Sequence, residues 1–156
     1  MKKFLQSTKK PIIIEDDILG ELLYDKTINS FEGHIPWLDK KIDISLDVDK
    51  DNKSGITKAR KAIKEMYLSA EKWDENMRKF AARKLIDLAR DWCESEEEAG
   101  KIAEESFAKR ITIESISMTS GGSFTAYFND DDIFAGHCIT VGGSLKKGIT
   151  SASMGG

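Results

Sequence analysis

Charged residues are distributed unevenly along this chain, and this distribution constrains its fold more than any other feature. Residues 56–110 hold about half of all the charged residues in roughly a third of the length. Residues 111–156 are poor in charge and rich in Ser, Thr, Gly and β-branched residues. Because β-branched residues favour strands and the long charged residues favour helices, helices are predicted in the middle of the chain and strands at its end.

The first third of the chain also has the pattern of strands. Apolar and polar residues alternate strictly over Lys41–Asp49, which is typical of a strand with one face in water. Phe31–Trp37 alternates in the same way, and a turn at residues 38–40 would join the two strands into an antiparallel hairpin. Pro36 has no N–H to donate, so its strand is predicted to be an edge or to end there. A further strand is predicted over residues 18–24.

Apolar residues recur at helical spacing from Ile56 to Trp92. This stretch contains no Gly or Pro, so one long kinked helix and two helices both fit it. A break between two helices would fall within Ser69–Asp74. Ser95 is followed by three glutamates, with Glu98 at the third helical position, which is a capping-box pattern. A short helix is therefore predicted from this point to about Phe107.

The last third is predicted to form four short strands separated by turns rich in Gly or Asp. Within the first of them the apolar residues change from one parity to the other, which predicts either a bulge near Glu114–Ser115 or burial on both faces of the strand. The four strands are placed at Arg110–Thr119, Ser123–Phe128, Ile133–Val141 and Ile149–Met154.

The order of strands, helices and strands predicts an α+β fold, in which two or three helices pack on one face of a largely antiparallel sheet. The length of 156 residues fits a single domain over 1–156. Residues 1–16 are expected to be a flexible or loosely attached N-terminal segment of it.

Composition excludes several classes of protein. A net charge of -3 offers no basic patch for nucleic acid. No apolar run approaches the roughly 20 residues of a membrane span, and polar residues interrupt the N-terminal stretch before it could serve as a signal peptide. We therefore expect a cytoplasmic protein that binds neither nucleic acid nor membrane. Cys93 and Cys138 form no CxxC motif and fit two free, buried thiols.

The segment Asn129–Cys138, NDDDIFAGHC, is the most concentrated group of reactive side chains. Asp130, Asp131 and Asp132 are interpreted as a turn that caps its own backbone, because adjacent side chains of an extended chain do not converge on one metal. His137 would point to the apolar side of the strand Ile133–Val141, either as a core residue or as a base in a pocket. Cys138 would then point to the opposite face, which excludes a nucleophile–base pair within this strand.

Other candidate motifs fail on their chemistry. Asp47, Asp49 and Asp51 resemble the start of a calcium loop, but Asn52 replaces the required Gly and Lys58 the required Glu. No phosphate-binding loop or nucleophile elbow is present in the sequence. We therefore predict neither a metal site nor a cofactor.

The order of several residues resembles a bacterial domain-of-unknown-function family, the one numbered 2262, over roughly residues 17–155. Its most specific part is the D-D-x-F-x-G-H segment, which is present as Asp131–His137. The family has no established activity, so the resemblance implies no catalytic residue. The other matching positions are Ile18–Gly20, Trp37, Ala81, Trp92, Phe107, Ile111–Met118, Tyr127, Asp130 and Gly155.

Two functions remain open from the sequence. The first is a non-catalytic module that binds another protein, of the immunity type, whose acidic surface suits a basic partner. The second is a small-ligand-binding protein or an enzyme with His137 in a pocket, aided by Asp131, Asp132 and His34. A third arrangement, an oligomer paired through the Pro36 strand, also remains open. The residues predicted to bind are Asp39, Asp43, Asp47, Asp49, Asp130, Asp131, Asp132 and His137.

Overall fold

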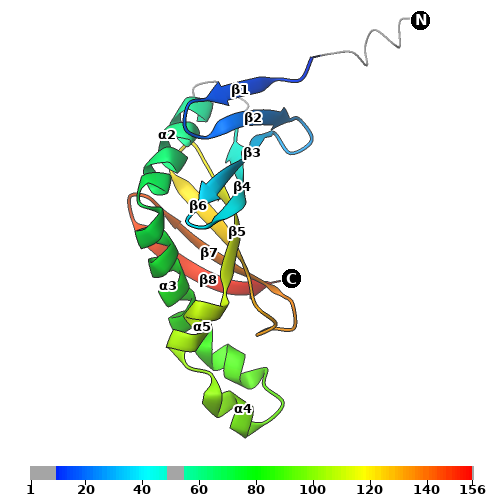
Figure 1. Ribbon diagram of the computed structural model, residues 1–156, viewed down its shortest axis with the longest axis vertical. Helices are drawn as coiled ribbons and strands as arrows, with labels where there is room; N and C mark the ends of the chain where they lie inside the picture. Colours follow the sequence, from blue (N-terminus) through cyan, green and yellow to red (C-terminus); the bar gives the residue numbers. More distant parts are fainter. Residues whose placement is uncertain (1–9, 49–54, 156) are drawn as a thin grey trace, which may run out of the picture.

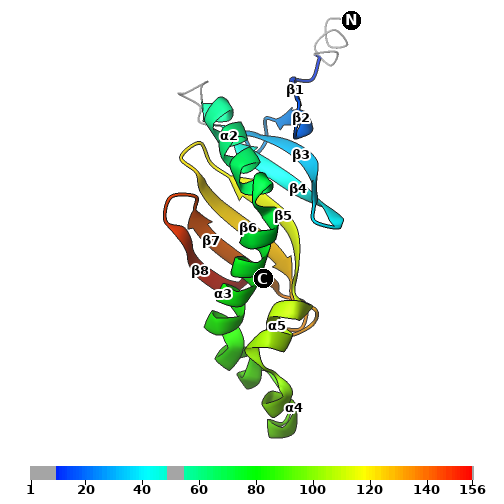
Figure 2. The same ribbon diagram turned by 60° about the vertical axis from the view of Figure 1, so that its left-hand side comes forward.

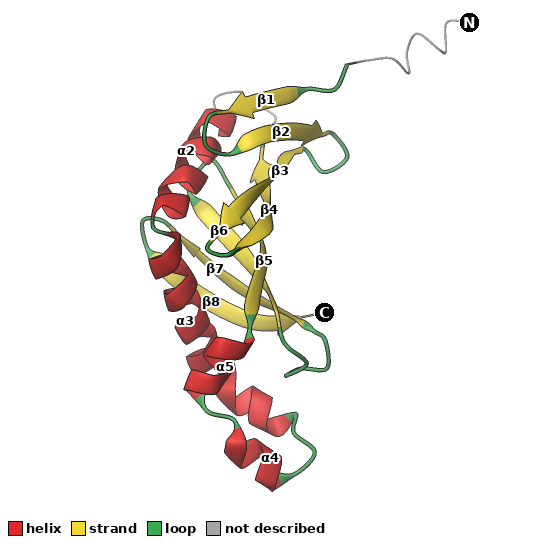
Figure 3. Cartoon of the chain, in the orientation of Figure 1, coloured by secondary structure: helices red, strands yellow, loops and turns green. Residues whose placement is uncertain are grey.

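The computed structural model of the chain describes residues 10–48 and 55–155 (Figure 1). The described residues form eight strands and four helices, which Figure 3 separates by colour. In chain order these elements are β1 (Ile13–Asp16), β2 (Gly20–Asp25), β3 (Ser30–Trp37), β4 (Lys40–Asp47), α2 (Gly55–Leu68), α3 (Ala70–Asp91), α4 (Glu96–Lys101), α5 (Glu104–Arg110), β5 (Thr112–Met118), β6 (Ser123–Asn129), β7 (Cys138–Ser144) and β8 (Gly148–Gly155).

All eight strands belong to one sheet, in which their order in space is the same as their order in the sequence. Neighbouring strands are antiparallel except β4 and β5, which are parallel. Parallel neighbours need a long crossover connection, and the helical segment between β4 and β5 supplies it. An α+β fold with a largely antiparallel sheet was predicted, and this is confirmed. The described residues contain four helices, where two or three were predicted.

The β3–β4 hairpin forms where the alternating pattern placed it. Its strands pair along their whole length around a two-residue turn, in which Leu38 has a φ of 57°. The alternate residues Ile35, Ile42 and Ile44 are buried. β3 is an interior strand between β2 and β4 and not the predicted edge, but β2 pairs with it only from Ser30 to Glu32 and leaves the margin at Pro36 open.

The positions at which the helices begin and end agree only in part with the predicted ones. Ser69 separates α2 from α3, inside the predicted region. Ser95 caps α4 by accepting the N–H of Glu98 at 3.2 Å. The single helix predicted to reach Phe107 is wrong, because Ile102 and Ala103 adopt extended backbone between α4 and α5.

The core lies between the sheet and the two long helices. Figure 2 shows α2 and α3 running across the strands. The alternate residues of the strands and the apolar stripes of α2 and α3 form one buried cluster. Trp73 of α3 stacks edge-on against Phe124 of β6, with their ring centroids 5.4 Å apart. The register of β5 shifts between Ile113 and Ser115, which confirms the predicted bulge.

Candidate functional site

The segment between β6 and β7 is a loop, and the strand predicted to begin at Ile133 is wrong. β7 begins only at Cys138. Asp131, Asp132 and Ala135 have φ values of 50°, 61° and 55°, which an extended strand does not allow. The Asp130 carboxylate holds the backbone in this shape by accepting hydrogen bonds from backbone N–H groups of the loop.

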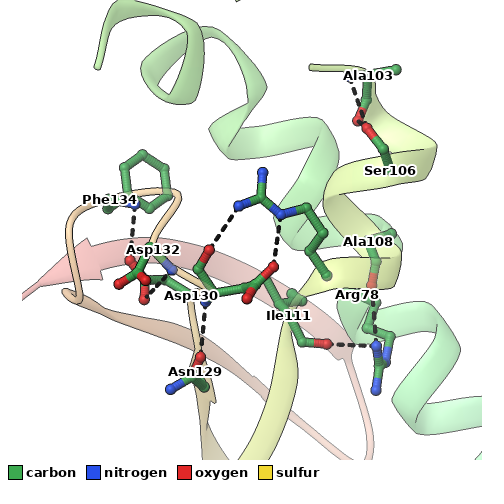
Figure 4. A network of polar contacts seen from close by, with 11 residues as sticks. Arg78, Ala103, Ser106, Ala108, Ile111, Asn129, Asp130, Asp132 and Phe134 are labelled. Carbon is green, nitrogen blue, oxygen red and sulfur yellow. Dashed lines mark hydrogen bonds and ion pairs between the residues drawn. The ribbon is translucent and has the colours of Figure 1, made fainter. Parts of the chain in front are cut away.

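Asp130 organises this loop from its interior (Figure 4). It is 2% exposed. Its carboxylate accepts the N–H groups of Asp132 at 3.1 Å, Phe134 at 2.8 Å and Gly136 at 3.0 Å. A carboxylate that satisfies three backbone donors is a structural group, comparable to the side chains that cap helices and turns. Asp130 was predicted to bind a partner, and its burial removes it from any docking surface.

Asp131 and Asp132 separate instead of converging. The Nε atom of Arg110 donates to Oδ2 of Asp131 at 2.9 Å, and Nη2 of Arg110 donates to the Asp131 carbonyl oxygen at 2.7 Å. Asp132 is exposed. The three consecutive carboxylates therefore have three different environments, which supports the turn interpretation.

His137 is packed rather than presented to a cavity. It is partly buried, and its Nδ1 lies 2.6 Å from the carbonyl oxygen of Phe134. Its ring stacks edge-on against Trp92, with the centroids 5.3 Å apart. It lies before β7, so the argument that Cys138 faces the opposite side of a strand does not apply. The thiol of Cys138 donates to the carbonyl oxygen of Ile139 at 3.6 Å, and burial, followed by the nearby Glu114, raises its pKa.

The acidic residues of the β3–β4 hairpin lie at its surface. Asp39 is in the turn, and Asp43 and Asp47 project from the exposed face of β4. Nδ1 of His34 lies 2.6 Å from Oδ1 of Asp43, and the two side chains are 64% and 70% exposed. Asp49 was also predicted to bind, but it lies outside the described residues.

Glu32 of β3 joins this group through the pairing of β3 with β4, and it was not among the residues predicted to bind. Its register partner on β4 is Ser45, so Asp43 and Asp47 are its two diagonal neighbours on the same face. Its Oε2 atom is buried and has no hydrogen-bond partner among the described residues. We call Glu32, Asp39, Asp43 and Asp47 the acidic face. The chain provides no Lys or Arg ion pair to any of them within the part that the structure describes.

A cavity of about 980 Å³ lies between α3 and α5, beside the β3–β4 turn. Its base is a polar network that links three elements. Nε1 of Trp37 donates to Oδ1 of Asp74 at 3.1 Å, and Nε of Arg78 donates to Oδ2 of the same carboxylate at 2.6 Å. Nη1 of Arg78 donates to the carbonyl oxygens of Ala108 and Ile111, which satisfies acceptors at the end of α5 (Figure 4).

The walls of this α3–α5 cavity carry charges of both signs. Lys79 pairs with Glu75 at 2.9 Å, and Lys109 pairs with Glu105 at 3.2 Å. Because the two partners of each pair have opposite charges, the cavity has no strong preference for one sign of ligand charge. The remaining lining residues are Leu38, Glu71, Ala82, Arg83 and Glu104. The helical pattern of the sequence placed the α3 residues, Glu104 and Glu105 in helices, but it could not bring α3 and α5 together.

A second cavity, of about 560 Å³, opens between the β1–β2 and β3–β4 turns. It forms where β2 diverges from β3. His34 and Asp39 line it together with Lys40 and Lys41, two lysines that form no ion pair with another described residue. His137 lines neither of the two cavities.

Asp16 anchors the N-terminal hairpin, in the segment expected to be loosely attached. Its buried carboxylate accepts the N–H groups of Ile18 and Leu19, both at 2.9 Å, and pairs with Arg60 and Lys64 of α2, both at 2.8 Å. Burial acts to raise the pKa of Asp16, but these hydrogen bonds outweigh it and hold the pKa well below its ordinary value. The last residues of this segment thus form β1, fixed to α2.

Two further tests concern other kinds of site. Across residues 10–48 and 55–155, no group of three or more His, Cys, Asp or Glu side chains is arranged to hold a metal ion. No described helix combines the length and the apolar character needed to cross a membrane.

Fold and site together define an α+β protein with an acidic hairpin surface and a separate inter-helix cavity. A family model described as an uncharacterized protein conserved in bacteria, DUF2262, matches residues 16–154. The chain therefore belongs to this family, which confirms the resemblance seen in the sequence. No curated protein and no solved structure matches the chain.

Proposed function

We propose that this protein is a non-catalytic module that binds another protein through the acidic face. The observation that carries the proposal is the set of carboxylates on β3, β4 and their turn, none of which forms an ion pair with a Lys or Arg of the described residues. Like charges on neighbouring strands repel one another. A cationic partner would relieve this repulsion.

The chemistry of this surface indicates the kind of partner. Exposed carboxylates of one sign raise the association rate of a basic protein and disfavour acidic ones. An immunity-type protein that neutralises a basic nuclease toxin is one class of protein with this requirement. Asp131 contributes less to such a surface, because Arg110 already pairs with it.

The arrangement of reactive groups supports a non-catalytic role. Asp43 lies between His34 on β3 and Ser115 on β5, so the base does not stand next to the hydroxyl as nucleophilic catalysis requires. The raised pKa of Cys138 disfavours the thiolate form that attacks substrates.

The test is quantitative capture of partners from an extract of the native host. Wild-type protein is compared with Asp39→Asn/Asp43→Asn/Asp47→Asn, and a matched control replaces Glu96, Glu97 and Glu98 of exposed α4 by Gln. The proposal predicts a basic protein that wild type and control retain and the aspartate variant loses. Equal retention by all three proteins would exclude the acidic face as the binding surface.

Small-ligand binding is the second candidate, and the α3–α5 cavity favours it. Its volume is at the upper end of the about 300–1,000 Å³ typical of ligand sites. This candidate site differs from the His137 pocket that the sequence left open, because His137 stacks on Trp92 and does not line the α3–α5 cavity.

This second candidate has its own measurement. Native mass spectrometry of the purified protein would detect a bound metabolite, and Ala108→Trp, which fills the cavity from α5, should abolish it. If the wild-type protein has only the mass of the ligand-free chain, and capture depends on Asp39, Asp43 and Asp47, protein binding remains as the function.

A further inference from the structure

The sheet has two outer margins, β1 and β8, and they differ in how they are protected. An edge strand exposes a row of unpaired backbone groups, which proteins protect by short length, charge or proline. β1 has this protection. It is four residues long, contains Glu15 and Asp16, and is tied to α2 through Arg60 and Lys64.

β8 has little of this protection. It is eight residues long, and its sequence, GITSASMG, contains no charged residue and no proline. The register irregularity opposite Gly142–Gly143 bends only its first residues, and Ser151–Gly155 pair regularly with β7. Ser151 and Ser153 are exposed. Among the described elements none lies beyond β8, which forms the margin of the sheet in Figure 2.

A second feature concerns α3, the helix next to this strand. α3 packs against β8. Its flank with Arg78 and Ala82 faces α5, so helical geometry places Phe80 and Lys84 on the opposite flank. Asp87 follows Lys84 by three residues, and the two charges have opposite sign. Asp87 also lies 3.7 Å from Arg90 of its own chain, in an exposed pair that a partner's lysine could join.

We propose that β8 pairs antiparallel with β8 of a second copy of this chain. A two-fold axis through the strand centre closes this arrangement as a dimer. With Ala152 opposite Ala152 of the second copy, Ser151 of each chain faces Ser153 of the other. The same axis runs α3 antiparallel to its counterpart, so that Lys84 of each copy approaches Asp87 of the other.

Size explains why both layers are needed. An eight-residue strand is about 26 Å long. Pairing of one such strand covers less than the about 800 Å² per partner of a standard interface. Contact between the α3 flanks supplies the additional area, and the neutral strand introduces no repulsion between identical chains.

The test measures molecular mass by light scattering and sedimentation equilibrium. The wild type should have twice the 17.4 kDa of one chain. Ser151→Lys/Ser153→Lys places like charges in facing pairs, and the dissociation constant should rise at least about tenfold. Thr112→Lys/Ser123→Lys, with the same charge change at exposed positions of interior strands, should remain dimeric.

A charge exchange on α3 provides an independent readout at exposed helix positions. Lys84→Asp should weaken the dimer, and Lys84→Asp/Asp87→Lys should restore it. Two results would overturn the proposal: a wild type with the mass of one chain at all concentrations, or a β8 variant that stays as dimeric as its control. Neither result bears on the acidic face, which lies on other strands.

Discussion

Three adjacent aspartates in the β6–β7 loop should differ sharply in their contribution to stability. Asn replaces Asp130, Asp131 or Asp132 one at a time, which removes the same charge at each position with almost no change in volume. The structure predicts that the Asp130 substitution is costly and that the other two are nearly neutral.

The magnitude follows from the contacts of Asp130. One of its oxygens accepts two N–H groups and the other accepts one. An amide offers an acceptor on one side only, so at least one backbone donor faces an NH₂ group. A hydrogen bond to a charged group contributes about 1.5–3 kcal/mol, and a buried donor left unpaired costs about 1–3 kcal/mol. We expect Asp130→Asn to lower the free energy of unfolding by about 2–4 kcal/mol.

The two control substitutions should change the free energy of unfolding much less. Asp131 and Arg110 form an exposed pair, so Asp131→Asn should cost less than about 1 kcal/mol. Asp132→Asn should stay within about 0.5 kcal/mol of wild type. Urea denaturation followed by circular dichroism measures all three. Equal losses at the three positions, or no loss at Asp130, would refute the description of this loop.

Three further outcomes are expected from urea or acid denaturation. Asp74→Asn should destabilise by about 3 kcal/mol or more, because it breaks a buried ion pair with Arg78, and a double-mutant cycle with Arg78→Met should show strong coupling. The depressed pKa of Asp16 adds stability that is complete above its ordinary pKa of about 3.9 and is lost as the pH falls below it, so the pH dependence of unfolding should weaken in Asp16→Asn. Gly33→Ala should cost about 1–3 kcal/mol, since its Cβ would lie 2.7 Å from a buried Leu22 methyl group; wild-type stability would contradict this packing.

Periodic segments of this chain were predictable because their pattern is local. The β3–β4 hairpin and the bulge near Glu114 each follow from the spacing of a few apolar residues. The helix break at Ser69 lies in the expected region, but the sequence left one kinked helix equally open. Tertiary contacts reinforce these local preferences rather than opposing them.

The β6–β7 loop was missed because its alternation imitates a strand. Ile133 and Phe134 are both buried, which an extended chain with one wet face does not produce. The decisive interaction is the Asp130 carboxylate, which reaches backbone donors up to six residues ahead. Spacing of apolar residues contains no information about such a contact.

The candidate sites depended on contacts between distant segments. Asp43 and Asp47 were selected from β4 alone, and Glu32 joined them only through the pairing of β3 with β4. Likewise, Asp74 and Arg78 have the sequence pattern of ordinary charges on a helix surface, and only the folded structure places α5 and Trp37 beside them.

The most direct test of the acidic face is the association rate of the protein with its captured basic partner at low and high salt. A surface that works through exposed carboxylates should associate at least about tenfold more slowly at about 0.5 M than at about 0.05 M salt, and Asp39→Asn/Asp43→Asn/Asp47→Asn should lose most of this dependence. Association that is independent of salt in the wild type, or equally dependent in the variant, would contradict the proposed binding surface.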